Sequence, residues 1–186
     1  MGLQAKAQTN SQTTRYNYFF LEAIRQQEMG NLAAAFDLLR HARDINPNAP
    51  EVYYELAGYY VEMQNNKAAR YNFERAAELA PYNSTYLEKL GQFYITQNDY
   101  EQALAAYEKL YANNKTREDV LQILYQLYGS QNNYKKMIEV TERMETLLGS
   151  SEQLSLTKMQ SFEQMGDKRK AQAELMRLVQ KNPLDL

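Results

Sequence analysis

Prolines and turn-forming residues recur along this chain with a period of 34 residues. Pro47 and Pro81 are one period apart, and Pro183 falls three periods later. Turn-forming pairs keep the same step, at residues 30–31, 64–65, 98–99, 132–133 and 166–167. A period of this length is typical of repeat proteins, in which a short unit that cannot bury its apolar face alone stacks on its neighbours. The period predicts one repeat domain over residues 16–183, with units at 16–49, 50–83, 84–117, 118–151 and 152–183.

Within each unit, apolar residues recur at helical spacing in two separate blocks. In the second unit the first block holds Tyr53, Leu56 and Tyr60, and the second block holds Ala69 and Phe73. Spacings of three and four residues place such side chains on one face of a helix. Each unit is therefore predicted to be a helix-turn-helix, and the chain to be all-α with about ten helices.

Two helix starts and both ends of the chain lead to further expectations. Thr116 and Ser150 are predicted to cap helices, because each has a polar residue three positions later. Residues 1–15 are rich in Gln, Asn and Thr and are predicted to form a flexible tail. Residues 184–186 directly follow the last repeat proline and are interpreted as a truncated end, so that the chain is a fragment of a larger repeat protein.

The order of large and small residues in the units resembles the tetratricopeptide repeat (TPR), whose pattern is W-x2-L-G-x2-Y, then A-x3-F, then P. The third unit carries Leu87, Leu90-Gly91 and Tyr94 in this order, followed by Ala103. The resemblance covers residues 16–183. It implies a right-handed α-α superhelix in which the first helices line a concave groove that holds a peptide or protein partner.

The last two units depart from the family pattern. The fourth has Tyr125 where a small residue is usual and Met137 where alanine is usual, so its two helices are expected to lie further apart. The fifth has Lys158 and Met159 in place of the Leu-Gly pair. On its second helix, Leu175 is expected to pack inward.

The predicted peptide-binding groove is rich in amides and carboxylates. Its residues are Phe20, Ile24, Gln27, Glu51, Tyr54, Glu55, Glu62, Glu88, Gln92, Gln122, Gln126 and Gln160. Tyr54 beside Gly58, with the two apolar residues of the first unit, would form a floor ringed by glutamates, which suits a peptide with an apolar anchor and nearby Lys or Arg. The alternative is that these side chains make ordinary contacts between units beneath a solvated acidic face. The Lys, Asn and Arg clamp by which some family members hold a C-terminal carboxylate is absent from these positions.

Composition argues against other classes of function. The net charge of −2 offers no basic excess for nucleic acid, and no apolar run is long enough for membrane insertion. The chain has no cysteine, and its only histidine, His41, has no nucleophile beside it, so neither a catalytic site, a metal nor a cofactor is predicted. Ala5-Lys6-Ala7 resembles a signal-peptide cleavage site but follows no apolar segment, so a cytoplasmic and an exported location both stay open.

The second helix of the last unit suggests an alternative function. Met176 and Val179 are predicted to form an exposed C-terminal edge, where a sixth unit would dock. The leading hypothesis is a scaffold for protein–protein interaction. The alternative is a structural self-association unit that forms homo-oligomers through this edge, or an edge at which the repeat array continues.

Overall fold

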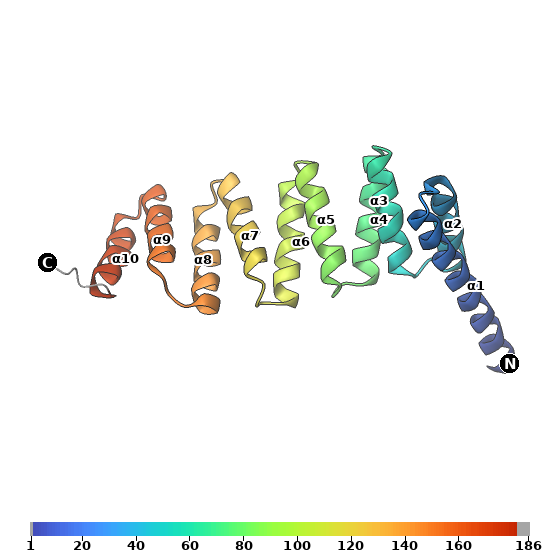
Figure 1. The fold of residues 1–186 in the computed structure, drawn as a ribbon. Coiled ribbons are helices and arrows are strands. Elements are labelled where there is room, and N and C mark those ends of the chain that lie inside the picture. The colour runs from blue at the N-terminus through green and yellow to red at the C-terminus, as the bar shows by residue number, and fades with distance from the viewer. Residues whose placement is uncertain (1, 182–186) are drawn as a thin grey trace. The chain divides into compact units, whose positions relative to one another are not determined.

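The computed structural model describes residues 2–181, and within that range every regular element is an α-helix. The ten helices of the described range, labelled in Figure 1, are α1 (Gly2–Glu28), α2 (Leu32–Ile45), α3 (Pro50–Glu62), α4 (Asn66–Leu79), α5 (Ser84–Thr96), α6 (Tyr100–Asn113), α7 (Glu118–Ser130), α8 (Tyr134–Leu148), α9 (Glu152–Gln164) and α10 (Lys168–Lys181). Two helices fall in each predicted unit. The predicted all-α fold is confirmed.

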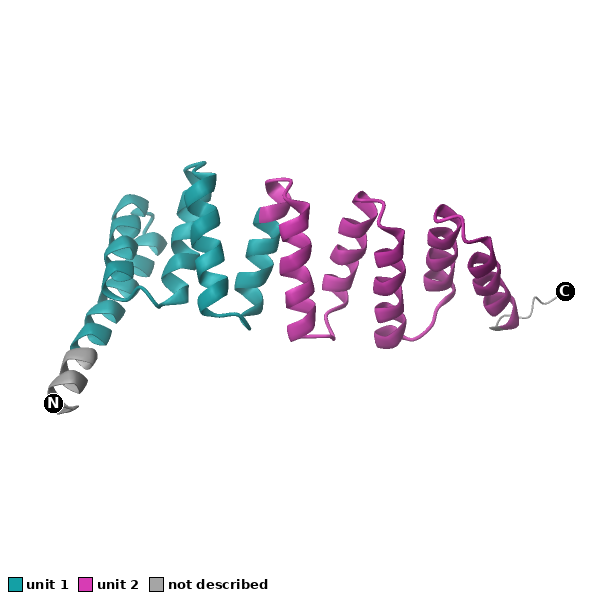
Figure 2. Cartoon of the chain, turned by 180° about the vertical axis from the view of Figure 1, so that it is seen from behind, with its two compact units in different colours: residues 1–93 teal, residues 94–186 magenta. Residues whose placement is uncertain are grey.

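The chain forms two compact units, residues 1–93 and 94–186 (Figure 2). In the first unit, α1 packs against α2 and α3 against α4, and α2 also contacts α3. In the second unit the pairs are α7 with α8 and α9 with α10, while α6 contacts α7 and α8 contacts α9. Each helix therefore packs mainly on its neighbours along the chain, as a repeat architecture requires.

The core of the first unit is aliphatic and aromatic. Ala23, Leu39 and Leu56 are fully buried, and Tyr53 is nearly so. Small side chains such as Ala23 let the two helices of a hairpin approach closely, while large side chains fill the space between hairpins. Half-buried aromatic residues, Phe36 among them, pack around this cluster.

The core of the second unit changes along the chain from apolar to partly polar side chains. Tyr107, Leu110, Leu121 and Leu124 are fully or almost fully buried in its earlier helices. Further along, the buried set includes the polar residues Thr141, Ser155, Lys158 and Ser161. The packing of α9 therefore depends on small hydroxyl side chains and one buried cation where earlier first helices use large apolar residues.

The turn inside each hairpin has the same backbone conformation. One residue per turn has a positive φ: Gly30 (79°), Gln64 (58°), Asn98 (58°), Asn132 (54°) and Gly166 (74°). The next residue caps the following helix in several repeats; Asn65 accepts a hydrogen bond from the amide of Ala68, and Asn133 one from that of Lys136. The 34-residue step of turn residues thus reflects a repeated left-handed turn followed by an N-cap.

The structure differs from two local expectations. Residues 2–15, expected to be a flexible tail, are helical as the first half of α1, and residues 11–15 are all exposed; their flexibility stays a prediction. Extending a helix that is already nucleated costs little, and this segment after Gly2 has no proline or glycine to end it.

The caps of α7 and α9 are Arg117 and Ser151, one residue after the expected Thr116 and Ser150. The expected C-terminal end, residues 184–186, lies outside the described residues.

Candidate binding surfaces

In the first unit, three of the predicted groove residues come together around Gly58. Gln27 from α1 and Glu55 and Glu62 from α3 line a shallow pocket of about 100 Å³, together with Tyr59 and Leu32. A Cβ placed on Gly58 would meet no other atom within 4 Å, so the surface above this glycine is open. We call this surface the Gly58 pocket.

The Gly58 pocket is negatively charged. Glu55 is half-buried and makes no hydrogen bond or ion pair with any described residue, and its burial raises its pKa above the ordinary value of a glutamate. The hydroxyl of Tyr59 donates to Oε1 of Gln27 over 3.4 Å. Glu62 is exposed at the rim. A cationic side chain entering here would lie near two carboxylates, one of them partly desolvated.

The predicted apolar floor around Tyr54 is engaged in packing. The Tyr54 ring lies 5.0 Å from that of Tyr86 and 6.4 Å from that of Phe73, centroid to centroid. Phe20 stacks on Tyr16 at 5.8 Å, and the Tyr16 hydroxyl donates to Oε1 of Glu51. The contacts of Tyr54 with Tyr86 and of Tyr16 with Glu51 join successive hairpins of the first unit. The half-buried positions of Phe20 and Tyr54 leave only part of each ring exposed to a partner.

In the second unit, Gln122 and Gln126 share a larger pocket. They project from α7 beside Tyr125, and Leu154 and Thr157 of α9 face them across a volume of about 220 Å³. Thr141 and Met144 of α8 complete the lining. We call this the Tyr125 pocket, and none of its lining residues carries a charge at neutral pH.

The other predicted site residues are placed as follows. Ile24 and Glu88 are half-buried, whereas Gln92 and Gln160 are exposed. Met176 and Val179 are 56% and 50% exposed on α10. Leu175, expected to pack inward, is 46% exposed. A further pocket, of about 440 Å³, lies between α9 and α10 and includes Leu175.

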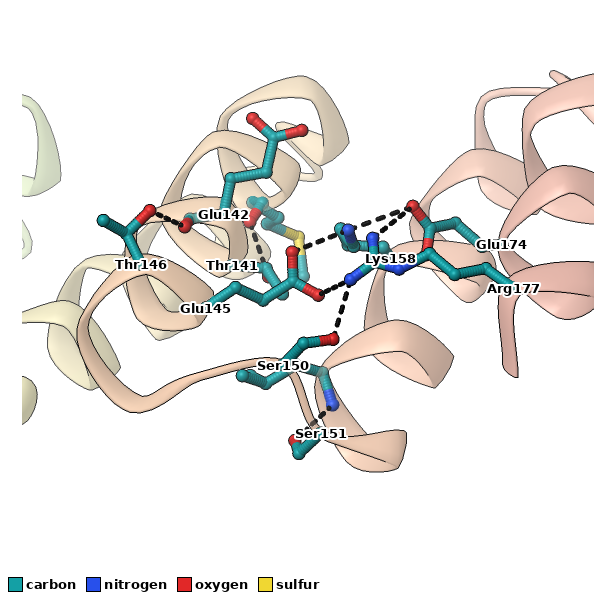
Figure 3. A network of polar contacts seen from close by, with 11 residues as sticks. Thr141, Glu142, Glu145, Thr146, Ser150, Ser151, Lys158, Glu174 and Arg177 are labelled. Carbon is teal, nitrogen blue, oxygen red and sulfur yellow. Dashed lines mark hydrogen bonds and ion pairs between the residues drawn. The ribbon is translucent and has the colours of Figure 1, made fainter. Parts of the chain in front are cut away.

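Sequence reasoning missed a polar network that joins α8, α9 and α10 (Figure 3). Nζ of Lys158 lies 2.8 Å from Oε2 of Glu145 and 3.0 Å from Oε1 of Glu174. Arg177 bonds the other oxygen of Glu145 at 3.0 Å and the hydroxyl of Ser150 at 2.7 Å. The Lys158 side chain is only 4% exposed. Its unusual position in the repeat was visible in the sequence, but its partners lie on other helices.

The tetratricopeptide repeat profile matches residues 50–83 and 84–116, which are the second and third units defined above by their period. The chain contains tetratricopeptide repeats. Among curated protein sequences, none matches this chain. The TPR pattern is thus directly detectable in the two units whose sequences keep it best.

Solved structures share the TPR fold at low sequence identity. A MamA structure from Desulfovibrio magneticus RS-1 is 16% identical with a TM-score of 0.58, over 92% of this chain and 98% of that one. A TPR protein from Parabacteroides merdae ATCC 43184 is 19% identical with a TM-score of 0.63, over 92% and 68%. YrrB, described as a TPR protein with an unusual peptide-binding site, is 14% identical with a TM-score of 0.60, over 90% and 86%. The predicted TPR fold is confirmed by these matches.

The described residues were also searched for other kinds of site. No group of three or more His, Cys, Asp or Glu side chains in that part of the chain is arranged to hold a metal ion. None of the helices described is both long and apolar enough to cross a membrane. The basic run Lys168-Arg169-Lys170 is exposed at the start of α10, where Lys170 pairs with Asp167 at 3.3 Å.

Proposed function

We propose that this TPR chain is a protein–protein interaction scaffold, without enzymatic activity of its own, that binds a partner peptide or protein on the surface formed by its first helices. The observation that carries the proposal is the Gly58 pocket. There three side chains from two successive first helices gather around an open glycine surface. TPR repeats supply such surfaces without any chemistry of their own, since function resides in the side chains placed on the fold.

The charge of the Gly58 pocket defines the partner. Glu55 and Glu62 would attract a Lys or Arg side chain, and the partly desolvated Glu55 would gain most from being paired. The apolar part of Tyr59 and the nearby Leu32 would contact the aliphatic stem of that side chain. A partner segment with an apolar anchor next to a basic residue fits this arrangement.

A peptide-binding experiment tests this proposal. Short labelled peptides with one apolar residue, with and without an adjacent Lys or Arg, are titrated with the wild-type chain, with Glu62→Lys and with Glu101→Lys. Both glutamates are exposed, but Glu101 lies at the start of α6 and lines no pocket described above. Glu62→Lys is expected to weaken binding of the basic peptides at least about tenfold, and added salt to weaken it further.

Glu101→Lys is the control for the change in net charge. Glu101→Lys makes the same charge change on the same chain and is expected to leave the basic peptides bound as in the wild type. Equal losses in the two variants would point to general electrostatic attraction instead. If the wild-type chain retains no basic peptide above background, the proposal is wrong.

A second candidate function is self-association through α10. Leu175, Met176 and Val179 are each about half-exposed and lie within one turn of one another along the helix. Sedimentation velocity at increasing concentration would show larger species that Met176→Glu removes. Tyr82→Glu, which makes the same charge change at an exposed aromatic residue outside α10, should leave them in place. A single monomeric species at the highest concentration would reject this candidate.

A further inference from the structure

One position on the second helices differs between the fourth repeat and the earlier ones. At successive 34-residue steps the chain has Leu39, Phe73, Tyr107 and Thr141. The first three are large side chains and all four residues are buried, with exposed fractions of 0%, 8%, 1% and 0%. The fourth repeat therefore has a small polar residue where its predecessors fill the interior with a large apolar or aromatic one.

The missing side-chain volume is not restored by the next helix. α9 has Ser155, also buried, at the position where α7 has Leu121, so two successive large side chains are absent from this part of the second unit. The hydroxyl of Thr141 is occupied by a hydrogen bond of 2.9 Å to the carbonyl oxygen of Met137. The Tyr125 pocket of about 220 Å³ lies beside Thr141.

No charged side chain lines the Tyr125 pocket, and two of its lining residues are apolar. Met144 and Leu154 supply thioether and aliphatic surface, and a charged group placed against them would lose its hydration with no counter-charge among the lining residues. An apolar cavity of about 150 Å³ in another protein takes up benzene, so a pocket of this size has room for one large apolar side chain.

The mouth of the same pocket carries polar groups suited to a peptide backbone. Tyr125 stands where the second and third repeats have Ala57 and Gly91, and its hydroxyl makes no hydrogen bond with any described residue. The amide of Gln126 likewise has no partner among the residues described, while Gln122 donates through Nε2 to Oε1 of Glu118 at 3.0 Å. A peptide backbone offers one donor and one acceptor per residue to such groups.

We propose that the Tyr125 pocket binds a single apolar side chain, of the size of leucine, methionine or phenylalanine, from an uncharged stretch of the partner protein. The ligand side chain takes the place that Leu39, Phe73 and Tyr107 fill in the earlier repeats. Tyr125 and the two glutamines hydrogen-bond the ligand backbone on either side of it. This inference rests on the proposed scaffold function and deepens it, because it assigns a second, chemically different subsite to the partner.

Labelled peptides with capped ends are the probe. They consist of Gly, Ser and Gln with one central Leu, Met, Phe, Ala, Lys or Asp, and their binding is measured by fluorescence anisotropy. The peptides with Leu, Met or Phe are expected to bind at least about tenfold more tightly than the Ala peptide, and the Asp peptide no better than Ala. Any stronger binding of the Lys peptide is expected to be lost in Glu62→Lys, because that binding belongs to the Gly58 pocket.

Two variants fill the pocket from different sides. Thr141→Leu introduces from α8 the residue that the first repeat has at this position, and Thr157→Phe blocks the mouth from α9, where Thr157 is half-exposed. The control is Thr146→Phe on α8. Thr146 is exposed and donates to the carbonyl oxygen of Glu142 at 2.9 Å, in the same way that Thr141 bonds Met137.

Loss of the apolar preference in both filling variants, with the preference kept in Thr146→Phe, supports the proposal. Unchanged binding of the Leu peptide to Thr157→Phe overturns it, as does equal binding of the Leu and Asp peptides or no binding of either. If Thr141→Leu does not fold, Thr157→Phe alone decides. A failure here, with binding of basic peptides still dependent on Glu62, would leave the proposed scaffold function standing, whereas loss of both activities would reject both.

Discussion

At the scale of single residues, the turns inside the hairpins place different residue types in the same left-handed backbone conformation. Gly30 and Gly166 adopt the left-handed backbone region at no steric cost, and Asn98 and Asn132 tolerate it. Gln64 holds the same conformation, with a φ of 58°, without either advantage. The fixed repeat length thus imposes a left-handed residue even where the local sequence does not favour one.

Gln64→Gly is expected to stabilise the chain. It removes the contact between Cβ and the backbone that disfavours a positive φ, which stabilises the folded state by about 1 kcal/mol. The larger conformational entropy of the unfolded glycine variant offsets part of this gain, so the net stabilisation is roughly 0.5 kcal/mol. Thermal unfolding followed by circular dichroism should show a higher midpoint. Gln131→Gly is the control. Gln131, the C-cap residue that follows α7, has a φ of −96°, so glycine there should lower the midpoint.

The half-buried carboxyl of Glu55 makes stability depend on pH. Burial raises its pKa in the folded state above that in the unfolded chain, so its charged form weakens folding. This cost is absent in acid, where the carboxyl is protonated in both states, and it grows as the pH rises through the two pKa values. Glu55→Gln should therefore raise the unfolding midpoint at neutral pH and have little effect in acid. A difference that stays constant across the pH range would contradict this explanation.

The sequence predicted where residues lie along each helix better than it predicted which residues of other helices they contact. The turn pairs and the buried face of α3 follow from spacing alone, because they are set by register within one helix. The departures at Tyr125 and Lys158 follow from the comparison of each unit with the TPR pattern. The caps of α7 and α9 lie one residue later than expected. At α9 the neighbouring Ser151 accepts the capping hydrogen bond from the amide of Leu154, and at α7 the hydroxyl of Thr116 donates to Oδ1 of Asn114 instead. The packing of Tyr54 on Tyr86 depends on side-chain direction between hairpins, which spacing does not determine.

At the scale of elements, α9 is attached to its neighbours by charge as well as by apolar packing. Lys158 occupies the position of Leu56, Leu90 and Leu124 in the preceding first helices. A buried ion pair contributes less than well-packed apolar residues of similar volume, but removing one partner is costly because it leaves a buried charge behind. The network of Figure 3 therefore makes the placement of α9 and α10 depend on all of its members together.

Lys158→Met is expected to destabilise the fifth repeat by roughly 2–3 kcal/mol, since Arg177 alone would remain to compensate Glu145 and Glu174. Urea denaturation followed by circular dichroism would measure the loss. Lys136→Met removes a half-exposed pair with Glu139 within α8 and should cost no more than about 0.5 kcal/mol. Similar losses in both variants would show that burial of Lys158 has little energetic consequence.

At the scale of the whole molecule, stability should vary along the chain, because each helix packs mainly on its sequence neighbours. Repeat proteins unfold as a sum of local terms and neighbouring interfaces. In the second unit, α7 buries Val120, Leu121 and Leu124, whereas α9 buries Ser155 and Ser161. The weaker apolar packing of α9 marks the fifth repeat as the part that opens first.

Amide hydrogen exchange is expected to show this gradient. The amides of α9 and α10 should exchange faster than those of α7 under native conditions, because their opening exposes less apolar surface. Lys158→Met should accelerate exchange in α9 and α10 while leaving α7 unchanged. Uniform protection across all three helices would mean that the second unit opens only as a whole.

The equal length of the hairpins, each closed by the same left-handed turn, also bears on how such a chain can change over generations. Losing one residue inside a helix would rotate every later side chain of that helix by about 100° and bring polar groups into the interior. Duplicating or excising a complete stretch of 34 residues would instead leave each remaining helix in its original phase. Genetic recombination can therefore alter this protein in whole blocks, adding or removing binding surface without redesigning any of it.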